Sequence, residues 1–243
     1  MATAPGAAAR RGPTLPDDAA QAAPVGAGPA PAVVPAPSAV PDSSALPAPS
    51  ALTPRPTLDL LVERALTRQP RLGATRLVSI DGPAGSGKST LAADLAGALR
   101  EGGRAVTVIG MDDLFAGWVG LDAGIEQLVS GVLAPLARGE AGSYRRWDWR
   151  ADDWAGTVVV PPTGVLVVEG CGSAPRAAGA WTNLLVFVET DRDHRLARGI
   201  ARDGEAMRAD WLRWMTLEER VHLREGTRAR ADVLLDGEGN VLR

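Results

Sequence analysis

The sequence is poor in the residues that build cross-links and metal clusters. Its 243 residues include one cysteine, Cys171, and two histidines. A single cysteine excludes an internal disulfide and a cysteine-built metal cluster, and it suits a reducing compartment. His194 and His222 have no spacing that indicates a metal site or a catalytic pair. We therefore predict a cytoplasmic protein that folds without cross-links.

Long apolar runs and an excess of positive charge are also missing. No apolar stretch approaches the ~18 residues of a membrane span, and prolines interrupt the apolar runs near the beginning of the chain, which argues against a secretion signal. The net charge is −3 and the pI is near 5.5, so no global basic field indicates nucleic-acid binding. We expect neither a membrane nor a nucleic-acid partner, and the oligomeric state stays open.

Aromatic residues are absent from the first part of the chain. Residues 1–56 are dominated by Ala and Pro, with scattered Gly and Ser. Such a segment cannot bury enough apolar area to offset the entropy lost on ordering, so it is predicted to be disordered. The remaining stretch, 57–243, is long enough for one substantial core and is predicted to form one nucleotide-binding domain.

Lysine is the scarcest basic residue, because Lys88 is the only one in the chain. It belongs to a stretch that satisfies the phosphate-binding loop pattern G-x-x-x-x-G-K-[ST] at Gly82, Gly87, Lys88 and Ser89. Glycines let the backbone curl so that successive N–H groups point at an anion. A chain that otherwise uses arginine keeps a compact ammonium here, which indicates a contact with the outer phosphates.

This loop predicts that ATP and Mg²⁺ are bound. Lys88 is expected to reach the outer phosphates and to take part in catalysis, Ser89 offers its hydroxyl to Mg²⁺, and the helix that starts here adds its positive dipole end. The alternative is a glycine-rich turn that binds nothing. The predicted nucleotide contacts in the loop are Gly82, Pro83, Ala84, Gly85, Ser86, Gly87, Lys88, Ser89 and Thr90.

Hydrophobic periodicity predicts strands that alternate with helices, which is typical of a three-layer α/β fold. The expected strands are 76–81, 104–109, 158–160, 165–168, 184–188 and 233–235. The expected helices are 58–68, 88–100, 123–138, 191–203 and 207–225.

Acidic residues follow two of the predicted strands. Asp112 and Asp113 come just after strand 104–109, at the edge where open α/β sheets bind ligands. We predict that Asp112 orients the acceptor hydroxyl or accepts its proton, with a capping pair as the alternative; Asp113 is the weaker candidate. Glu169 closes strand 165–168 and is predicted to hold Mg²⁺ directly or through water, with an ordinary strand-end charge as the alternative.

Two further groups of side chains are candidates for substrate contacts. Arg195, Arg198 and Arg202 fall at i, i+3 and i+7, so one helix face would present three guanidinium groups, either to phosphates as a lid or to solvent and nearby acids. Trp147, Asp148 and Trp149 could provide a stacking wall and a polar hook, although tryptophans are more often core residues. Trp211 and Trp214 are expected to be packing residues.

Taken together, these motifs resemble the uridine kinase-like P-loop kinases, a group that also includes pantothenate kinase and phosphoribulokinase relatives. The resemblance covers roughly residues 75–237. It implies a P-loop NTPase fold with a five-stranded parallel sheet, in which the acid-ending strand lies beside the phosphate-loop strand. It also implies that Asp112 is the catalytic aspartate, that Glu169 is the metal-side acid, and that Arg195, Arg198 and Arg202 are lid arginines.

The function that follows is an ATP-dependent kinase that phosphorylates a hydroxyl of a small acceptor, such as a nucleoside. Where uridine kinases carry Tyr-Asp-Phe and then a histidine, this chain has Trp147-Asp148-Trp149 and Asp152, so the resemblance does not fix uridine as the acceptor.

Three alternatives remain open. The first is a nucleoside monophosphate kinase of the cytidylate type, which the loop also resembles and for which Arg145 and Arg146 could supply cations. The second is a nucleotide-binding regulatory ATPase without a small-molecule acceptor. The third is a pseudo-enzyme that binds ATP without turnover.

Overall fold

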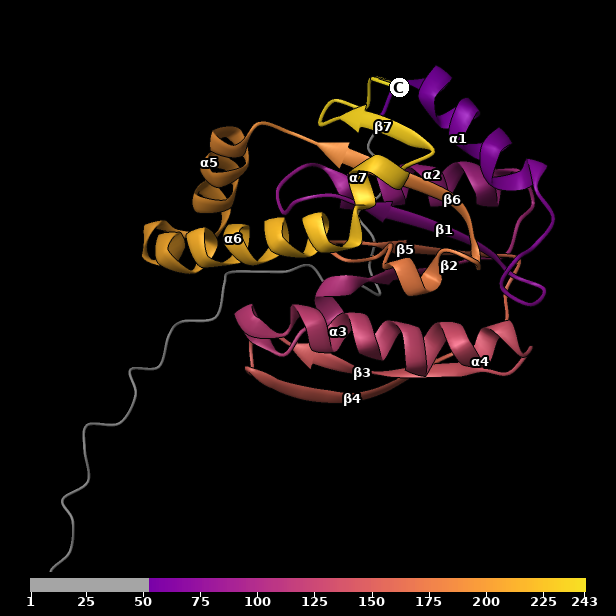
Figure 1. Ribbon diagram of the computed structural model, residues 1–243, viewed down its shortest axis with the longest axis horizontal. Helices are drawn as coiled ribbons and strands as arrows, with labels where there is room; N and C mark the ends of the chain where they lie inside the picture. The colour runs from indigo at the N-terminus through magenta and orange to yellow at the C-terminus, as the bar shows by residue number, and fades with distance from the viewer. Residues whose placement is uncertain (1–52) are drawn as a thin grey trace, which may run out of the picture. The chain divides into compact units, whose positions relative to one another are not determined.

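The computed structural model describes residues 53–243 (Figure 1). The predicted disorder of residues 1–56 therefore lies outside the described residues, except for the last four positions of that segment. There the helix α1 (Arg55–Thr67) begins earlier than the sequence pattern indicates. Pro56 stands in its first turn, where a missing N–H costs nothing. Residues that directly precede 57 thus belong to the folded domain.

The centre of the domain is a five-stranded parallel sheet, as the sequence resemblance implies. The strand order is β2-β5-β1-β6-β7, and every neighbouring pair is parallel. The acid-ending strand β5 lies beside the phosphate-loop strand β1, with Ile80 opposite Glu169. The strands are β1 (Arg76–Asp81), β2 (Val106–Gly110), β5 (Val165–Glu169), β6 (Thr182–Glu189) and β7 (Val233–Asp236).

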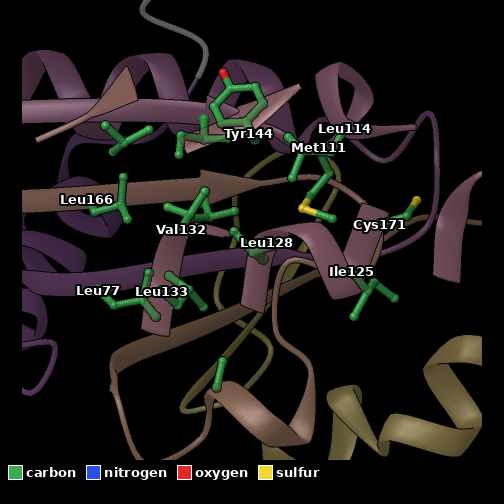
Figure 2. Close-up of a cluster of buried hydrophobic side chains, with 14 of the residues drawn as sticks. Leu77, Met111, Leu114, Ile125, Leu128, Val132, Leu133, Tyr144, Leu166 and Cys171 are labelled. Atoms are coloured by element: carbon green, nitrogen blue, oxygen red, sulfur yellow. The ribbon is translucent and has the colours of Figure 1, made fainter. Parts of the chain in front are cut away.

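Alternate side chains of the central strands enter two different cores. Val78 and Ile80 of β1 pack with α1 and α2 (Lys88–Glu101) on one face. Leu77 of β1 and Leu166 of β5 point to the other face, where Figure 2 shows them beside Val132 and Leu133. Because both faces of the sheet are covered, each strand is almost continuously apolar. Successive side chains along a strand point to opposite faces and so enter different cores.

The second face is covered by one long helical stretch. The predicted helix 123–138 is present as α3 (Leu121–Gln127), a π-helical segment η3 (Leu128–Leu133) and α4 (Ala134–Ala137). Leu128 and Val132 on this stretch contribute buried side chains to the core (Figure 2). Among the residues described, no helix combines the length and the apolar character needed to cross a bilayer.

A two-stranded antiparallel hairpin lies beside this layer and is longer than the sequence pattern indicates. It consists of β3 (Gly142–Asp148) and β4 (Asp153–Val160), whereas only 158–160 is expected as a strand. Charged residues interrupt the apolar alternation of β3, so periodicity alone does not reveal it. Trp147 and Trp154 are paired across the two strands, which places both on the hairpin.

The helices α5 (Arg192–Asp203) and α6 (Arg208–Glu225) lie at the end of the sheet to which the strands point (Figure 1). The short helix α7 (Thr227–Arg230) then returns the chain to β7. Asp191 caps α5 by accepting hydrogen bonds from the backbone N–H groups of Asp193 and His194. The carboxyl edge of the sheet, where the motifs gather, is therefore bounded by these two helices.

Candidate functional site

The phosphate-loop motif connects β1 to α2, as its pattern requires. Gly82 and Gly87 have φ angles of 141° and 100°, which are strained for residues with a side chain. A Cβ atom on Gly82 would lie 2.2 Å from the carbonyl oxygen of Val188, so the backbone of β6 leaves no room for one. Lys88 is the first residue of α2, and its Nζ donates a hydrogen bond to the carbonyl of Pro83 (2.8 Å). The side chain of Lys88 is therefore hydrogen-bonded to the backbone of its own loop.

Lys88 is almost fully buried, and acidic groups surround it. Burial by itself lowers the pKa of an ammonium, but the charges of Cys171, Glu169, Glu218 and Asp112 outweigh it and hold the pKa of Lys88 above its ordinary value. The side chain consequently stays cationic at neutral pH. A cation fixed under an anion-binding loop suits a phosphate ligand.

Glu169 and Ser89 provide two adjacent oxygen atoms. The hydroxyl of Ser89 donates to Glu169 Oε1 at 3.0 Å. Burial, together with the charge of Asp112, raises the pKa of Glu169 to about 7, against the lowering effect of Lys88. A hydroxyl beside a carboxylate matches the donor set that Mg²⁺ takes in nucleotide sites, where phosphate oxygens and water complete the shell. In the described residues no group of three or more acidic, histidine or cysteine side chains forms a metal cage.

Asp112 lies in the short helix η1 (Met111–Leu114), directly after β2. Its side chain lines the same pocket as Lys88, Ser89 and Glu169. Desolvation by the pocket walls raises the pKa of Asp112, and the charges of Lys88 and Arg202 oppose that shift. A carboxylate whose proton affinity is increased in this way is suited to accept a proton.

Asp113, the weaker candidate, points elsewhere. It is buried, and the hydroxyl of Tyr144 lies 3.4 Å from its Oδ2. The two neighbouring acids therefore separate, one toward the pocket and one into the packing between η1 and β3.

Two acids that the sequence analysis did not single out lie buried beneath the loop. Asp81, at the end of β1, accepts hydrogen bonds from the backbone N–H groups of Gly82 (2.7 Å), Gly172 (3.0 Å) and Ala174 (3.0 Å). Its Oδ1 also lies 3.0 Å from Nε2 of His222. This carboxylate fastens the start of the phosphate loop to the turn after β5 and to α6.

Glu218 is the second buried acid, and it is 1% exposed. It accepts a hydrogen bond from the backbone N–H of Ala84 (2.8 Å) and forms an ion pair with Arg195 at 2.7 Å. Arg195 also donates to the carbonyl oxygens of Ala84 (3.1 Å) and Thr190 (3.1 Å). Both the backbone N–H and the backbone carbonyl of Ala84 are thus held in place. The sequence could have indicated Glu218 only through its position, because it is an acidic residue on the buried face of a helix.

The three arginines of α5 enter three different environments. Arg195 is buried under the loop and does not reach the pocket. Arg198 is exposed and its Nη1 lies 3.4 Å from the carbonyl of Gly85. Arg202 lines the pocket with Asp112, while its guanidinium makes two hydrogen bonds to the neighbouring Asp203 (2.8 and 2.9 Å). The spacing i, i+3, i+7 spans enough of the helix surface for each side chain to meet a different neighbour.

The pocket beyond Asp112 has an aromatic wall, for which the sequence analysis proposed only the segment 147–149. Its cavity volume is about 100 Å³. Trp211 and Trp214 are packing residues, as expected, because both are at least 95% buried, and they also line this pocket. The wall comes from η1, the 3-10 helix η2 (Gly117–Val119), the turn after β3 and α6. Its members are Phe115, Trp118, Trp149, Trp211 and Trp214.

Trp149, and neither Trp147 nor Asp148, reaches this pocket. Trp147 packs edge to face against Trp154 on the hairpin, with ring centroids 5.1 Å apart. Asp148 accepts the backbone N–H of Arg150 (2.8 Å) and so closes the turn at the end of β3. The chain leaves the strand at this turn, which directs Trp149 to the backbone carbonyl of Asp112, to which its indole N–H donates (2.9 Å).

Two adjoining cavities of about 320 and 560 Å³ lie on the other side of the loop. Gly87 and Thr90 line the first of them, and Arg198 and residues 236–238 line both. Thr57 of α1 fixes the turn after β7 by donating from its hydroxyl to the carbonyl of Gly239 (2.8 Å). This cleft begins where the phosphate loop ends.

Comparison with known proteins places this arrangement among kinases of known fold. No family model and no curated protein matches the sequence. A candidate uridine kinase from Bacillus stearothermophilus superposes with a TM-score of 0.56 at 23% identity, over 75% of this chain and 98% of that protein. A candidate fructose transport system kinase from Silicibacter sp. TM1040 gives a TM-score of 0.55 at 25% identity, over 73% of this chain and 98% of that protein. The fold is therefore that of the uridine kinase-like P-loop kinases, as the sequence resemblance indicates.

Proposed function

We propose that this protein is an ATP- and Mg²⁺-dependent kinase that transfers the γ-phosphoryl group to a hydroxyl of a small acceptor. The observation that carries the proposal is the position of Asp112, which lines one pocket together with the phosphate-loop Lys88 and with Ser89 and Glu169. A nucleotide-binding site alone would need no carboxylate at that place. The likeness to a protein described as a fructose transport system kinase supports a small-molecule acceptor.

Each group of residues has a separate role in the proposed transfer. The loop N–H groups and Lys88 hold the phosphates and neutralise charge that moves to the leaving oxygen. Mg²⁺, held at Ser89 and Glu169, would balance the charge of the phosphate oxygens. Asp112 orients the acceptor hydroxyl and takes its proton as the new O–P bond forms. Arg202 supplies a second cation at the pocket side of the transferred group.

A nucleoside monophosphate as the acceptor is less well supported. It would require cations for a second phosphate, and Arg145 and Arg146 are the candidates that the sequence offers. Neither residue lines the pocket, and the guanidinium of Arg145 lies 4.4 Å from the ring centroid of Trp154 on the hairpin. A hydroxyl acceptor therefore fits the charges of the pocket better than a phosphate acceptor does.

The test is ADP release by the purified protein with ATP, Mg²⁺ and a panel of nucleosides, sugars including fructose, pantothenate, CMP and UMP. We expect release that depends on an uncharged alcohol. With that alcohol, Asp112→Asn should lower kcat by about 10²–10⁴-fold, since the proton acceptor is lost, and leave the KM for ATP nearly unchanged.

Asp59→Asn is the matched control, because Asp59 has the same side chain but lies exposed on α1, outside the pocket. It should turn over normally. Full activity of Asp112→Asn would show that the assigned role is wrong. ADP release that no small molecule accelerates would instead favour a regulatory ATPase.

A further inference from the structure

The acceptor half of the pocket is lined mainly by aromatic rings. Four of the seven tryptophans of the chain, together with Phe115, form its wall. Trp118 occupies the centre of this group. It meets Trp149, Trp211 and Trp214 at steep interplanar angles of 76°, 64° and 80°, with centroids 5.9–6.0 Å apart. These are edge-to-face contacts, so the rings do not form two parallel walls. We call this group of four indole rings the tryptophan box.

Two of the four indole N–H groups of this wall already have partners. The indole N–H of Trp149 donates to the backbone carbonyl of Asp112, and that of Trp211 donates to Asp203 Oδ2, both at 2.9 Å. Asp203 in turn binds the guanidinium of Arg202. These groups therefore have little hydrogen-bonding capacity left for the body of an acceptor.

The remaining polar side chains of the pocket gather at its phosphate end. They are Lys88, Ser89, Asp112 and Glu169, which the proposed transfer uses. Among the lining side chains in residues 53–243 there is no amide, no imidazole and no hydroxyl other than that of Ser89. A uracil or cytosine edge buried in this wall would lose its bonds to water and find few side-chain partners in return.

We infer that the acceptor is an alcohol carried by an apolar or aromatic ring, which the tryptophan box holds by its faces while Asp112 engages the hydroxyl. This inference rests on the proposed kinase activity and narrows it. The physical reason is that an apolar ring edge has no hydration to lose, while its faces gain contact with several indole rings. A box of this kind discriminates weakly between rings of similar size, so several ring alcohols should be accepted.

Two matched pairs of probes separate the ring edge from the size of the acceptor. The first is β-D-ribofuranosylbenzene against uridine, and the second is benzyl alcohol against 5-(hydroxymethyl)uracil. Within each pair the ring size and the hydroxyl are the same, and only the polarity of the ring edge changes. We expect kcat/KM to be at least tenfold higher for the apolar member of a pair that is turned over. A smaller ratio, or a preference for the uracil member, would overturn the inference.

Binding without turnover distinguishes the failure of this inference from the failure of the proposed function. Quenching of tryptophan fluorescence by the four probes is measured with a non-hydrolysable ATP analogue bound. We expect the apolar probe to quench at a concentration at least tenfold lower than its uracil partner. If it does so but no alcohol releases ADP, the phosphoryl transfer is wrong and the pocket chemistry stands. Equal or weaker quenching by the apolar probes overturns the pocket chemistry whatever the turnover.

Variants of the wall test the location of the binding. Trp118→Ala should weaken the fluorescence-detected binding of the apolar probe at least tenfold, whereas Trp118→Phe, which keeps an aromatic face, should restore most of it. Trp154→Phe is the control, because Trp154 packs on the hairpin and does not line the pocket. Unchanged binding in Trp118→Ala, with its fold verified by circular dichroism, would overturn the inference.

Discussion

The phosphate side and the acceptor side of the pocket are built in different ways. The phosphate side is one continuous segment, β1–loop–α2, whose backbone is fixed by charged groups behind it: Asp81, Glu218 and Arg195. The acceptor side is assembled from four separate elements, and aromatic contacts hold it together. A directional network positions N–H donors to within tenths of an ångström, while an apolar wall fixes shape and leaves the choice of ligand broader. We therefore expect the site to be selective for its nucleotide and to bind a wider range of acceptors.

The helix α6 contributes to both sides. Glu218 and His222, four residues apart, face the loop and Asp81, while Trp211 and Trp214 face the acceptor pocket. Because one rigid helix carries both sets of side chains, a shift of α6 would alter nucleotide and acceptor sites together. Variants that affect one side only are therefore the most informative.

The largest effect is expected on the phosphate side, from Lys88→Ala. The ammonium is the cation of the loop, so its loss should reduce turnover by about 10³-fold and weaken ATP binding strongly. Isothermal titration with ATP and an assay of ADP release measure the two effects. Lys88 is the only lysine in a chain that otherwise uses arginine. The variant Lys88→Arg keeps the charge and so tests whether a compact ammonium is required. ATP binding at wild-type strength in the alanine variant would disprove the phosphate-side assignment.

The second prediction removes the support beneath the loop. Glu218→Ala leaves Arg195 buried without its partner, and breaking a buried pair costs about 3–5 kcal/mol of folding stability. Urea unfolding should show this loss. Glu218→Leu combined with Arg195→Met removes both charges and should recover much of the stability, but it should still raise the KM for ATP because the Ala84 peptide is no longer held.

The ion pair Arg138–Glu140 provides the control, because both side chains are more than half exposed. Glu140→Gln should leave stability and the KM for ATP unchanged, as surface pairs usually contribute little. If the double variant bound ATP normally, Glu218 and Arg195 would stabilise the fold without positioning the loop.

The third prediction concerns pH. Because the pKa of Glu169 is raised to about 7, a proton and Mg²⁺ compete for its carboxylate near neutrality. The group is about one-tenth ionised at pH 6 and about nine-tenths at pH 8, so the apparent Mg²⁺ affinity of the nucleotide complex should rise about tenfold over that interval. Activity titrated with Mg²⁺ at each pH measures it.

Glu169→Gln separates this effect from the titration of the nucleotide itself, because the variant cannot ionise at that position. Its Mg²⁺ dependence should vary less with pH than that of the wild type; an equal slope would remove Glu169 from the metal site. In the ligand-free protein, pH acts on folding stability, and the effect of Glu169 has the opposite direction. A raised pKa stabilises the fold below the ordinary value of 4.5, and that contribution is lost as the pH rises through 7.

The smallest effect is expected on the acceptor side, from Gly199→Ala. A Cβ atom at Gly199 would lie 2.3 Å from Cε2 of Trp211, so the indole must move along the pocket wall. We expect the KM for the acceptor to change a few-fold while the KM for ATP stays constant. Ala201→Ser, which adds one heavy atom to the exposed face of the same helix, should change neither value. A rise in the KM for ATP alone would show that the two sides are not independent.

The local part of the site could be predicted from the sequence, and the assembled part could not. The loop, its lysine and the strand–helix context form one short segment, so pattern and periodicity are enough to locate them. Trp147 and Trp149 show the limit. They are two residues apart and chemically identical, and the turn closed by Asp148 decides which one reaches the pocket. The arginines of α5 show the same limit, since helical spacing places them on one side without stating what each will meet.

By itself, the sequence determined the order along the chain of the five strands of the parallel sheet, the phosphate loop around Lys88 and the acids at the ends of β2 and β5, because each depends on neighbours within a few residues. Only the tertiary structure decided that Asp81 and Glu218 support the phosphate loop and that four tryptophans from three segments close the acceptor side. Such contacts join residues up to 141 positions apart. Chain-local chemistry contains no information on which distant faces will meet; packing of the whole core selects them.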